Sequence, residues 1–493
     1  MRFTRMPSRV ACLLTAGTAL ASVIACSDTE ARTGPGGGVG GSAGTAGGGV
    51  GGSAGTAGGG VGGDAGGGVG GDATTVPLIG DALDGHCPGG KPPGNGVAPG
   101  NALHKLTLSS YPNAVCNDGT PAIMYLRKAS TPAAANKWVI HMQAGASCSN
   151  YDVCLERWCG IHYDAAKMSS RFAPPSSTGT GIFSRGAANA FGPANQVYIY
   201  YCSSDSWLGR RSDAVLSDPA GANVPYRLHF RGHDILAAVA DELTKGAKSD
   251  DGAEALPSLS NATEVLFSGS SAGSNGLSQT LDWWASEVPG AKAFGMFDSI
   301  YLPIPEDIDD SAVASKYVAG LKSEWTDTRG TLYRGFADES CVTAHPGEDA
   351  YLCALTSHVQ LNHTTTPFFT RQDLTDPVAY NYLAAAGATL DQYARWTRTS
   401  MERLAGVTTN AEEKSAITKA PGAYASNCGQ HIALLNSQWF GVAATGNASV
   451  QNAGGTPLTL HDALGAWATG TSINALDTIP STIGVCAPIT ADQ

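Results

Sequence analysis

The sequence predicts an α/β protein with a mostly parallel central sheet, helices on both faces and long insertions. Short apolar runs alternate with longer amphipathic segments from about residue 80 onward. Strand–helix–strand alternation of this kind is typical of a parallel sheet covered by helices. The folded body is expected to span 80–493. No second linker divides it, so one large domain with insertions is the simplest organisation.

Four apolar runs are the predicted buried strands of this sheet, because short continuous runs of this kind are typical of them. They are 137–143 (KWVIHMQ), 196–201 (QVYIYY), 263–268 (TEVLFS) and 367–371 (PFFTR). Between the second and third runs, 232–247 is expected to be a helix because its apolar residues share one face. These residues are Ile235, Leu236, Val239 and Leu243.

The first 26 residues are expected to be a lipoprotein signal peptide. Their positive charge comes from Arg2, Arg5 and Arg9. The apolar stretch 10–24 is too short to span a bilayer. It ends at Cys26 in a pattern suited to cleavage and lipidation, and Ser27 favours the outer membrane. An ordinary secretory signal is the alternative. Either signal predicts export, and the lipid anchor at the bacterial envelope is the only membrane contact expected.

A glycine-rich linker is predicted for 27–79. GGGVGGSAGTA occurs at 36–46 and 47–57, and GGGVGGDA follows at 58–65 and 66–73. A solenoid is excluded because valine alone cannot build a core in each repeat. Without large apolar side chains the segment cannot offset its ordering entropy, so it is predicted to be a disordered tether.

The charge of the chain argues against two classes of partner. The formal net charge is −12, and its lysines and arginines are scattered rather than clustered. Neither nucleic acid nor an anionic membrane surface is therefore expected as a ligand. The same acidity is a mark against de-esterified pectin, which is itself anionic.

Ten cysteines follow Cys12 and Cys26, and an even number in an exported protein favours disulfides. They are Cys87, Cys116, Cys148, Cys154, Cys159, Cys202, Cys341, Cys353, Cys428 and Cys486. A zinc site is the competing interpretation, but no two of them form a CxxC. The prediction is that the protein holds no metal and no cofactor.

The strongest local motif is GSSAG at 269–273, which has the form G-x-S-x-G. It follows a predicted strand and precedes a stretch of helical character. A serine on such a turn has a strained backbone, and glycines two residues away relieve the crowding. Ser271 is therefore the predicted nucleophile, in preference to an inert glycine-rich loop.

A serine needs a base, and in this motif's usual context an acid and then a histidine follow it along the chain. Five histidines lie downstream, and chemistry alone does not choose among them. They are His345, His358, His363, His431 and His461.

Further segments occur in a recognisable order. They are CNDGT (116–120), WVIH (138–141), QAG (143–145) with Cys148, YCSSD (201–205) with Trp207, GSSAG (269–273), PFF (367–369) through Gln372 to Asp376, CGQH (428–431), GTPL (455–458) and Trp467. Together they resemble the pectin acetylesterase/Notum family of carboxylesterases over nearly all of 116–467. The resemblance implies an α/β-hydrolase-like fold.

Residue by residue, the resemblance implies Ser271 as nucleophile, His431 as base and Asp376 as acid. Asp373 and Asp298 are rivals of Asp376 for the acid role. The imidazole would take the serine proton, and the carboxylate would orient it and stabilise its charged form.

The resemblance also implies backbone donors for the oxyanion at Gly145, Ala146 and Ala272. Family members commonly carry Gly-Gly-Trp where this chain has Ala144-Gly145-Ala146. The backbone N–H donors are still present in this chain, but the tryptophan that would form a wall of the acyl or sugar pocket is absent. The size of the substrate is therefore open.

The disulfides implied by the resemblance are Cys116–Cys202, Cys148–Cys154 and Cys341–Cys353. A bridge at Cys428 would steady the loop of His431. No partner is assigned to Cys428, and Cys87, Cys159 and Cys486 also stay unassigned.

The expected function is that of a monomeric serine carboxylester hydrolase acting on acylated carbohydrate. It would remove short acyl groups, above all acetyl, from a polysaccharide such as pectin. A lipase-like carboxylesterase acting on longer acyl esters is the first alternative. A non-catalytic surface binding protein is the second.

Overall fold

The computed structural model describes residues 75–83, 87, 102–161, 165–405, 419–436, 439–440 and 458–477. The predicted signal peptide 1–26, with Cys26, lies outside these residues. So do Cys486 and almost all of the linker predicted for 27–79. The prediction of a lipidated, tethered N-terminus therefore stays a prediction.

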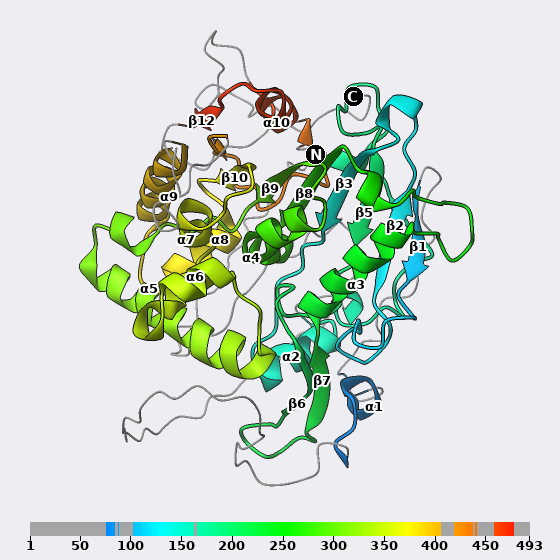
Figure 1. Ribbon diagram of the computed structural model, residues 1–493. Coiled ribbons are helices and arrows are strands. Elements are labelled where there is room, and N and C mark those ends of the chain that lie inside the picture. The colour runs from blue at the N-terminus through cyan, green and yellow to red at the C-terminus, as the bar shows by residue number, and fades with distance from the viewer. Residues whose placement is uncertain are drawn as a thin grey trace, which may run out of the picture.

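A ten-stranded sheet forms the centre of the described structure (Figure 1). From β12 to β5 neighbouring strands are parallel, and β2, β1 and β4 complete the sheet with antiparallel pairing. The mostly parallel sheet is confirmed. Its spatial order is β12 (Asn474–Leu476), β11 (Gly422–Ser426), β10 (Phe368–Asp373), β9 (Lys292–Asp298), β8 (Glu264–Ser270), β3 (Lys137–Met142), β5 (Asn195–Ile199), β2 (Ile123–Arg127), β1 (Ala102–Thr107) and β4 (Ser176–Thr178).

The four predicted strands are β3, β5, β8 and β10, and the predicted helix 232–247 is α3 (Gly232–Lys245). All lie within one or two residues of their predicted ends. The buried patterns of β3 and β8 are nearly continuous, because helices cover both faces of a parallel sheet.

Strand β9 shows directly that helices cover both faces. A Cβ on Gly295 would point at Leu281 of α4 (Ala272–Ser286). The ring of its neighbour Phe294 contacts Trp467 of α10 (Leu460–Ala468), with the ring centroids 6.1 Å apart. Adjacent residues of a strand point to opposite faces. Helices α4 and α10 therefore pack on opposite sides of the sheet.

The longest insertion lies between β9 and β10, at the left of Figure 1. It contains α5 (Ser311–Ser323), the π-helical segment η7 (Glu324–Tyr333), α6 (Glu339–Ala344), the 3-10 segment η8 (Gly347–Ala354) and α7 (Thr356–Asn362). After β10 come α8 (Pro377–Ala384) and α9 (Leu390–Ala405).

A smaller unit of α1 (Ile79–Leu83), α2 (Tyr151–Trp158) and the hairpin β6 (Arg211–Leu216) with β7 (Tyr226–Phe230) lies at the bottom of Figure 1. Here the folded body starts slightly before residue 80. Leu78 forms a β-bridge with Arg227, and Ile79 is fully buried. None of the helices described has the length and apolar composition that a bilayer crossing requires.

Four disulfides lie within the described residues. Three are the pairs that the resemblance implies, and the fourth pairs Cys87 with Cys159. Cys428 is also disulfide-bonded. Disulfides of this number are typical of proteins that fold outside the reducing cytoplasm.

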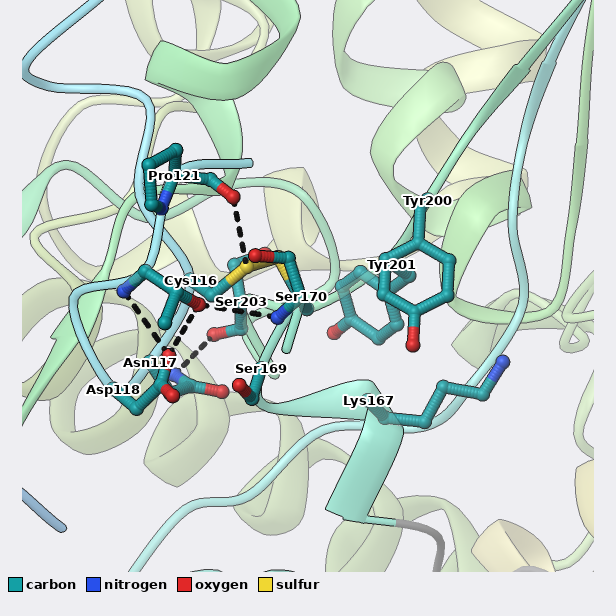
Figure 2. The surroundings of a disulfide bond; sticks show 12 residues. Cys116, Asn117, Asp118, Pro121, Lys167, Ser169, Ser170, Tyr200, Tyr201 and Ser203 are labelled. Atoms are coloured by element: carbon teal, nitrogen blue, oxygen red, sulfur yellow. Dashed lines mark hydrogen bonds between the residues drawn. A yellow bond between two sulfur atoms is a disulfide. The ribbon is translucent and has the colours of Figure 1, made fainter. Parts of the chain in front are cut away.

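The Cys116–Cys202 bridge ties the segment between β1 and β2 to the residues that follow β5 (Figure 2). Beside it the amide of Asn117 donates to the carbonyl of Ser203 at 2.7 Å. The bridge therefore secures the start of the 203–207 loop, which borders the site described below.

Removing this bridge is expected to cost more stability than removing the short Cys148–Cys154 bridge. The two bridges span 86 and 6 residues. Loop-closure entropy predicts about 4.6 kcal/mol for the long loop and about 2.2 kcal/mol for the short one. Thermal unfolding of the two double Cys→Ser variants measures the difference. An equal fall in Tm would contradict the entropic account.

Candidate active site

The turn of Ser271 joins the end of β8 to the start of α4. Ser271 has φ 52° and ψ −116°, a conformation that L-residues rarely adopt, and it is 7% exposed. Its N–H donates to the carbonyl oxygen of Asp298 on the neighbouring strand β9, at 2.9 Å. The strained backbone is therefore held by the adjacent strand.

Both glycines of the motif are required by close contacts. A Cβ on Gly269 would lie 2.3 Å from the carbonyl oxygen of Gly273. A Cβ on Gly273 would lie 2.0 Å from the carbonyl oxygen of Met142 on β3. Any larger residue at either position would push α4 away from the sheet and displace the hydroxyl of Ser271.

A continuous hydrogen-bonded chain links Ser271 to two residues that follow it in the sequence. Nε2 of His431 lies 2.8 Å from Oγ of Ser271. Nδ1 of His431 lies 2.9 and 3.0 Å from the two carboxylate oxygens of Asp376. With Nδ1–H donating to Asp376, Nε2 accepts the hydroxyl proton of Ser271 in its hydrogen bond.

Asp376 is fixed by its place at the start of α8. One carboxylate oxygen accepts from the N–H groups of Val378 and Ala379 at 2.8 and 3.1 Å. The other accepts from the side-chain amide of Gln372 at 3.0 Å. The carboxylate is fully buried, whereas the side chain of His431 is 20% exposed. These contacts leave the carboxylate one orientation, toward the imidazole.

Asp298, a rival for the acid role, does not contact an imidazole but holds the backbone beside His431. Its Oδ2 accepts from the N–H groups of Ala433 and Leu434 at 2.9 and 3.0 Å. The same oxygen accepts from the hydroxyl of Ser270 at 2.8 Å. Asp298 thus connects the turn of Ser271 to the segment that follows the histidine.

Asp373, the second rival, holds the segment before the histidine. Its carboxylate accepts from the N–H groups of Cys428 and Gly429 at 2.8 and 3.1 Å. Burial raises the pKa of Asp373, and the neighbouring positive charge of Arg371 opposes that rise. Asp373 therefore anchors the loop through the two backbone N–H groups that it accepts.

Arg371 lies between the two rival carboxylates, 3.2 Å from Asp298 and 3.5 Å from Asp373. The three side chains are at most 2% exposed. The guanidinium also donates to the carbonyl oxygens of Gln430 and His431, each at 2.7 Å. Arg371, Asp298 and Asp373 therefore all bond the backbone of the loop that carries His431.

The candidate oxyanion donors lie at the same sheet edge. Met142 pairs with Gly269 across β3 and β8, so 145–146 and 271–272 follow adjacent parallel strand ends. Gly145 and Ala146 have φ of 153° and 53°. The N–H of Ala272 is the first in α4, where helical N–H groups lack partners within the helix.

The loop 203–207 packs beside the segment that carries Gly145 and Ala146, and hydrogen bonds hold it there. Asp205 is fully buried and accepts from the N–H of Gly232 at 2.7 Å and from the hydroxyl of Ser203 at 2.7 Å. Burial raises the pKa of Asp205 to about 6, and these hydrogen bonds oppose the rise. The carbonyl oxygen of Ser204 accepts from the N–H of Cys148 at 2.9 Å.

A cavity of about 240 Å³ adjoins the turn of Ser271. Asn275, whose N–H donates to the carbonyl oxygen of Ser271 at 3.0 Å, is one of its walls. Ser271 and His431 themselves do not line it. Its walls combine apolar and polar side chains, among them Val153, Ile300, Leu302, Lys316, Tyr317, Leu321, Glu324, Arg329 and Leu355.

The other downstream histidines have different surroundings. His461 contacts Asp462 at 2.9 Å and accepts from the N–H of Ala190 at 3.1 Å. His345, His358 and His363 gather in the α6–α7 segment. Of the five candidates, only His431 is hydrogen-bonded to Ser271 within the described residues.

Sequence reasoning missed the role of Arg371 and assigned none to Gln372. A signal existed, since a charged and polar RQD run ends an otherwise apolar strand. Charged side chains are rarely buried unless paired. That run could have been recognised as a buried polar network at the carboxyl end of the sheet.

Comparison with known proteins agrees with this architecture. The family model described as Pectinacetylesterase matches residues 100–483. A solved structure of the Wnt deacylase Notum from Drosophila superposes with a TM-score of 0.54 at 24% identity, covering 76% of this chain and 96% of that chain. This similarity supports the fold.

Several curated relatives are palmitoleoyl-protein carboxylesterases. The human protein NOTUM is 32% identical over 206 residues, which are 40% of this chain and 35% of that protein. The Xenopus laevis protein notum2 is 26% identical over 354 residues, 68% of this chain and 63% of that protein. The first of these matches spans about a third of the relative's length. The family match covers most of the chain, which therefore belongs to the pectinacetylesterase family, a family of carboxylic ester hydrolases.

Proposed function

We propose that Ser271, His431 and Asp376 are the nucleophile, base and acid of a serine carboxylester hydrolase. The observation that carries this proposal is the unbroken Asp376–His431–Ser271 hydrogen-bonded chain. It stands on a strained strand-to-helix turn, the setting that aims a hydroxyl at a substrate.

In the first half-reaction the hydroxyl oxygen of Ser271 attacks the ester carbonyl while His431 takes its proton. Asp376 stabilises the resulting imidazolium, which then protonates the leaving alcohol as the ester C–O bond breaks. The acyl group is now bound to Ser271 as an ester, and the imidazole is neutral again.

In the second half-reaction His431 takes a proton from water, and the hydroxide attacks the acyl-enzyme. The carboxylic acid leaves, and Ser271 recovers its proton from the imidazolium. In both steps the N–H groups of Gly145, Ala146 and Ala272 would stabilise the oxyanion. Losing one such donor typically lowers the rate about 10²–10³-fold.

The preferred substrate is an acetylated polysaccharide, with pectin as one example. Ala144, Gly145 and Ala146 are small residues where family members commonly carry a tryptophan, which is compatible with a bulky leaving alcohol. The second candidate is a longer acyl ester. The apolar walls of the neighbouring cavity, with Ile300, Leu302 and Leu321, favour that alternative.

Ser271→Ala is expected to abolish labelling by a fluorophosphonate probe and to lower ester hydrolysis about 10⁴-fold or more. Ser278→Ala, a serine on the same helix whose hydroxyl bonds the carbonyl of Asn275, is the matched control and should keep both. Absence of labelling in the wild-type protein would favour the non-catalytic binding role instead.

The acid role is tested by comparing Asp376→Asn with Asp373→Asn. Asparagine caps a helix about as well as aspartate, so Asp376→Asn should nearly keep its Tm while kcat falls about 10³–10⁴-fold. Asp373→Asn removes one partner of a buried ion pair and should cost about 3–5 kcal/mol of unfolding free energy. Thermal unfolding and kinetics of both variants are measured together. If Asp373→Asn lost kcat and Asp376→Asn did not, the acid role would pass to Asp373.

Acyl length is tested with p-nitrophenyl acetate, octanoate and palmitate. A short-acyl esterase should show the highest kcat/KM for acetate, by at least about tenfold, since a pocket discriminates chain length through buried methylenes. Ala385 lines the cavity, so Ala385→Trp would fill part of it. For a short-acyl esterase this variant should leave kcat/KM for the acetate ester unchanged. Preference for the longer esters, lost in Ala385→Trp, would establish the lipase-like alternative.

A further inference from the structure

Three imidazoles converge between α6 and α7. One ligand atom from each of His345, His358 and His363 lies within 4.8 Å of the others. Nε2 of His345 and Nε2 of His358 are only 3.0 Å apart. Ring nitrogens that converge in this way are the donor set that binds a borderline divalent cation such as Zn²⁺.

The fold holds the three rings in place. His345 caps the end of α6, His358 lies in α7, and His363 caps the end of α7. The Cys341–Cys353 disulfide ties α6 to η8, immediately before α7. His358 and His363 are 7% and 0% exposed. The donors are therefore largely organised before any ion arrives.

Hydrogen bonds orient two of the rings. The hydroxyl of Ser340 donates to Asp338 at 2.6 Å, and its oxygen lies 3.0 Å from Nδ1 of His363. With its proton directed to Asp338, Ser340 accepts from Nδ1–H of His363, and Nε2 is then the nitrogen with a lone pair. Such outer partners are typical of histidine ligands.

The amide of Asn362 lies 3.2 Å from Nδ1 of His358. Its oxygen and nitrogen exchange by rotation of the amide, so it can accept from Nδ1–H when Nε2 binds an ion.

We propose that His345, His358 and His363 form a binding site for a divalent cation of the Zn²⁺ type. Two nitrogens bound tetrahedrally at about 2.0–2.1 Å from zinc stand about 3.3 Å apart. The observed 3.0 Å between His345 and His358 needs little adjustment. The sequence predicted no metal, because no two cysteines form a CxxC and no histidine pair was assigned metal-ligand spacing; His358 and His363, five residues apart, were not recognised as such a pair.

Cys341 lies beside the three rings, but its sulfur is bonded to Cys353 and is not a thiolate. The protein therefore supplies three imidazole nitrogens, and water or another small ligand completes the tetrahedron. The site binds without any redox step and is independent of the proposed roles of Ser271 and His431.

The position of the site suggests what the cation does. Ala354, Leu355 and Thr356, between the disulfide and His358, line the cavity beside the nucleophile turn. An ion shared by α6 and α7 adds a second cross-link to that wall. It would stabilise the insertion between β9 and β10 and keep the cavity in one shape.

The test uses the full-length exported protein without a polyhistidine tag, stripped of metal with EDTA. Calorimetric titration with Zn²⁺ should give one ion per chain, and bound Zn²⁺ should raise Tm. Co²⁺ should give the intense visible absorption of a tetrahedral site. His345→Gln and His358→Gln should each weaken binding at least about 100-fold.

His104→Gln is the matched control, because His104 bonds Asp251 at 2.7 Å, outside the cluster. Its Zn²⁺ affinity should equal that of the wild type. His345 is only partly buried, so His345→Gln should fold, and far-UV circular dichroism checks this.

The proposal is overturned if the folded wild type binds no Zn²⁺, or if both cluster variants bind it as tightly as His104→Gln. The rings then form a hydrogen-bonded imidazole group only. Fluorophosphonate labelling of metal-free protein separates this outcome from a failure of the hydrolase proposal.

Discussion

The buried guanidinium of Arg371 is the interaction on which the position of His431 depends. It pairs with Asp298 and Asp373 and donates to two carbonyl groups of the histidine loop. Removing one partner of such a buried pair typically costs about 3–5 kcal/mol, because the remaining charge is left uncompensated. The loop carries little regular structure of its own, so these bonds to the sheet decide where the imidazole lies.

Asp298 couples that network to the turn of Ser271. Its side chain bonds Ser270 and the backbone after His431, and its own carbonyl oxygen accepts from the N–H of Ser271. A residue at positive φ costs about 1–3 kcal/mol and persists only when its surroundings determine it. Strand β9 supplies those surroundings. One residue therefore holds both the strained turn and the loop that must meet it.

Some of the fold and the site follows from local pattern. The strands β3, β5, β8 and β10 are apolar runs whose burial shows in their composition, and the two glycines around Ser271 have a steric reason that the motif itself expresses. The other six strands of the sheet, β1, β2, β4, β9, β11 and β12, were not predicted. β11 is rich in alanine and glycine and β12 has three residues, so neither has a strong local signal.

The sequence by itself determined the parallel α/β class, the serine-bearing turn and the presence of acids and histidines downstream. The family resemblance favoured Asp376 over its two rivals, and the tertiary structure shows that Asp376 is the carboxylate that contacts the imidazole. Asp298, Asp373 and Asp376 all lie at the carboxyl edge of the sheet, and their roles differ by the groups that they contact. The same holds for the histidines of α6 and α7. A side chain's type is local, but its partners are set by strand order and helix packing, which bring together residues far apart in the chain.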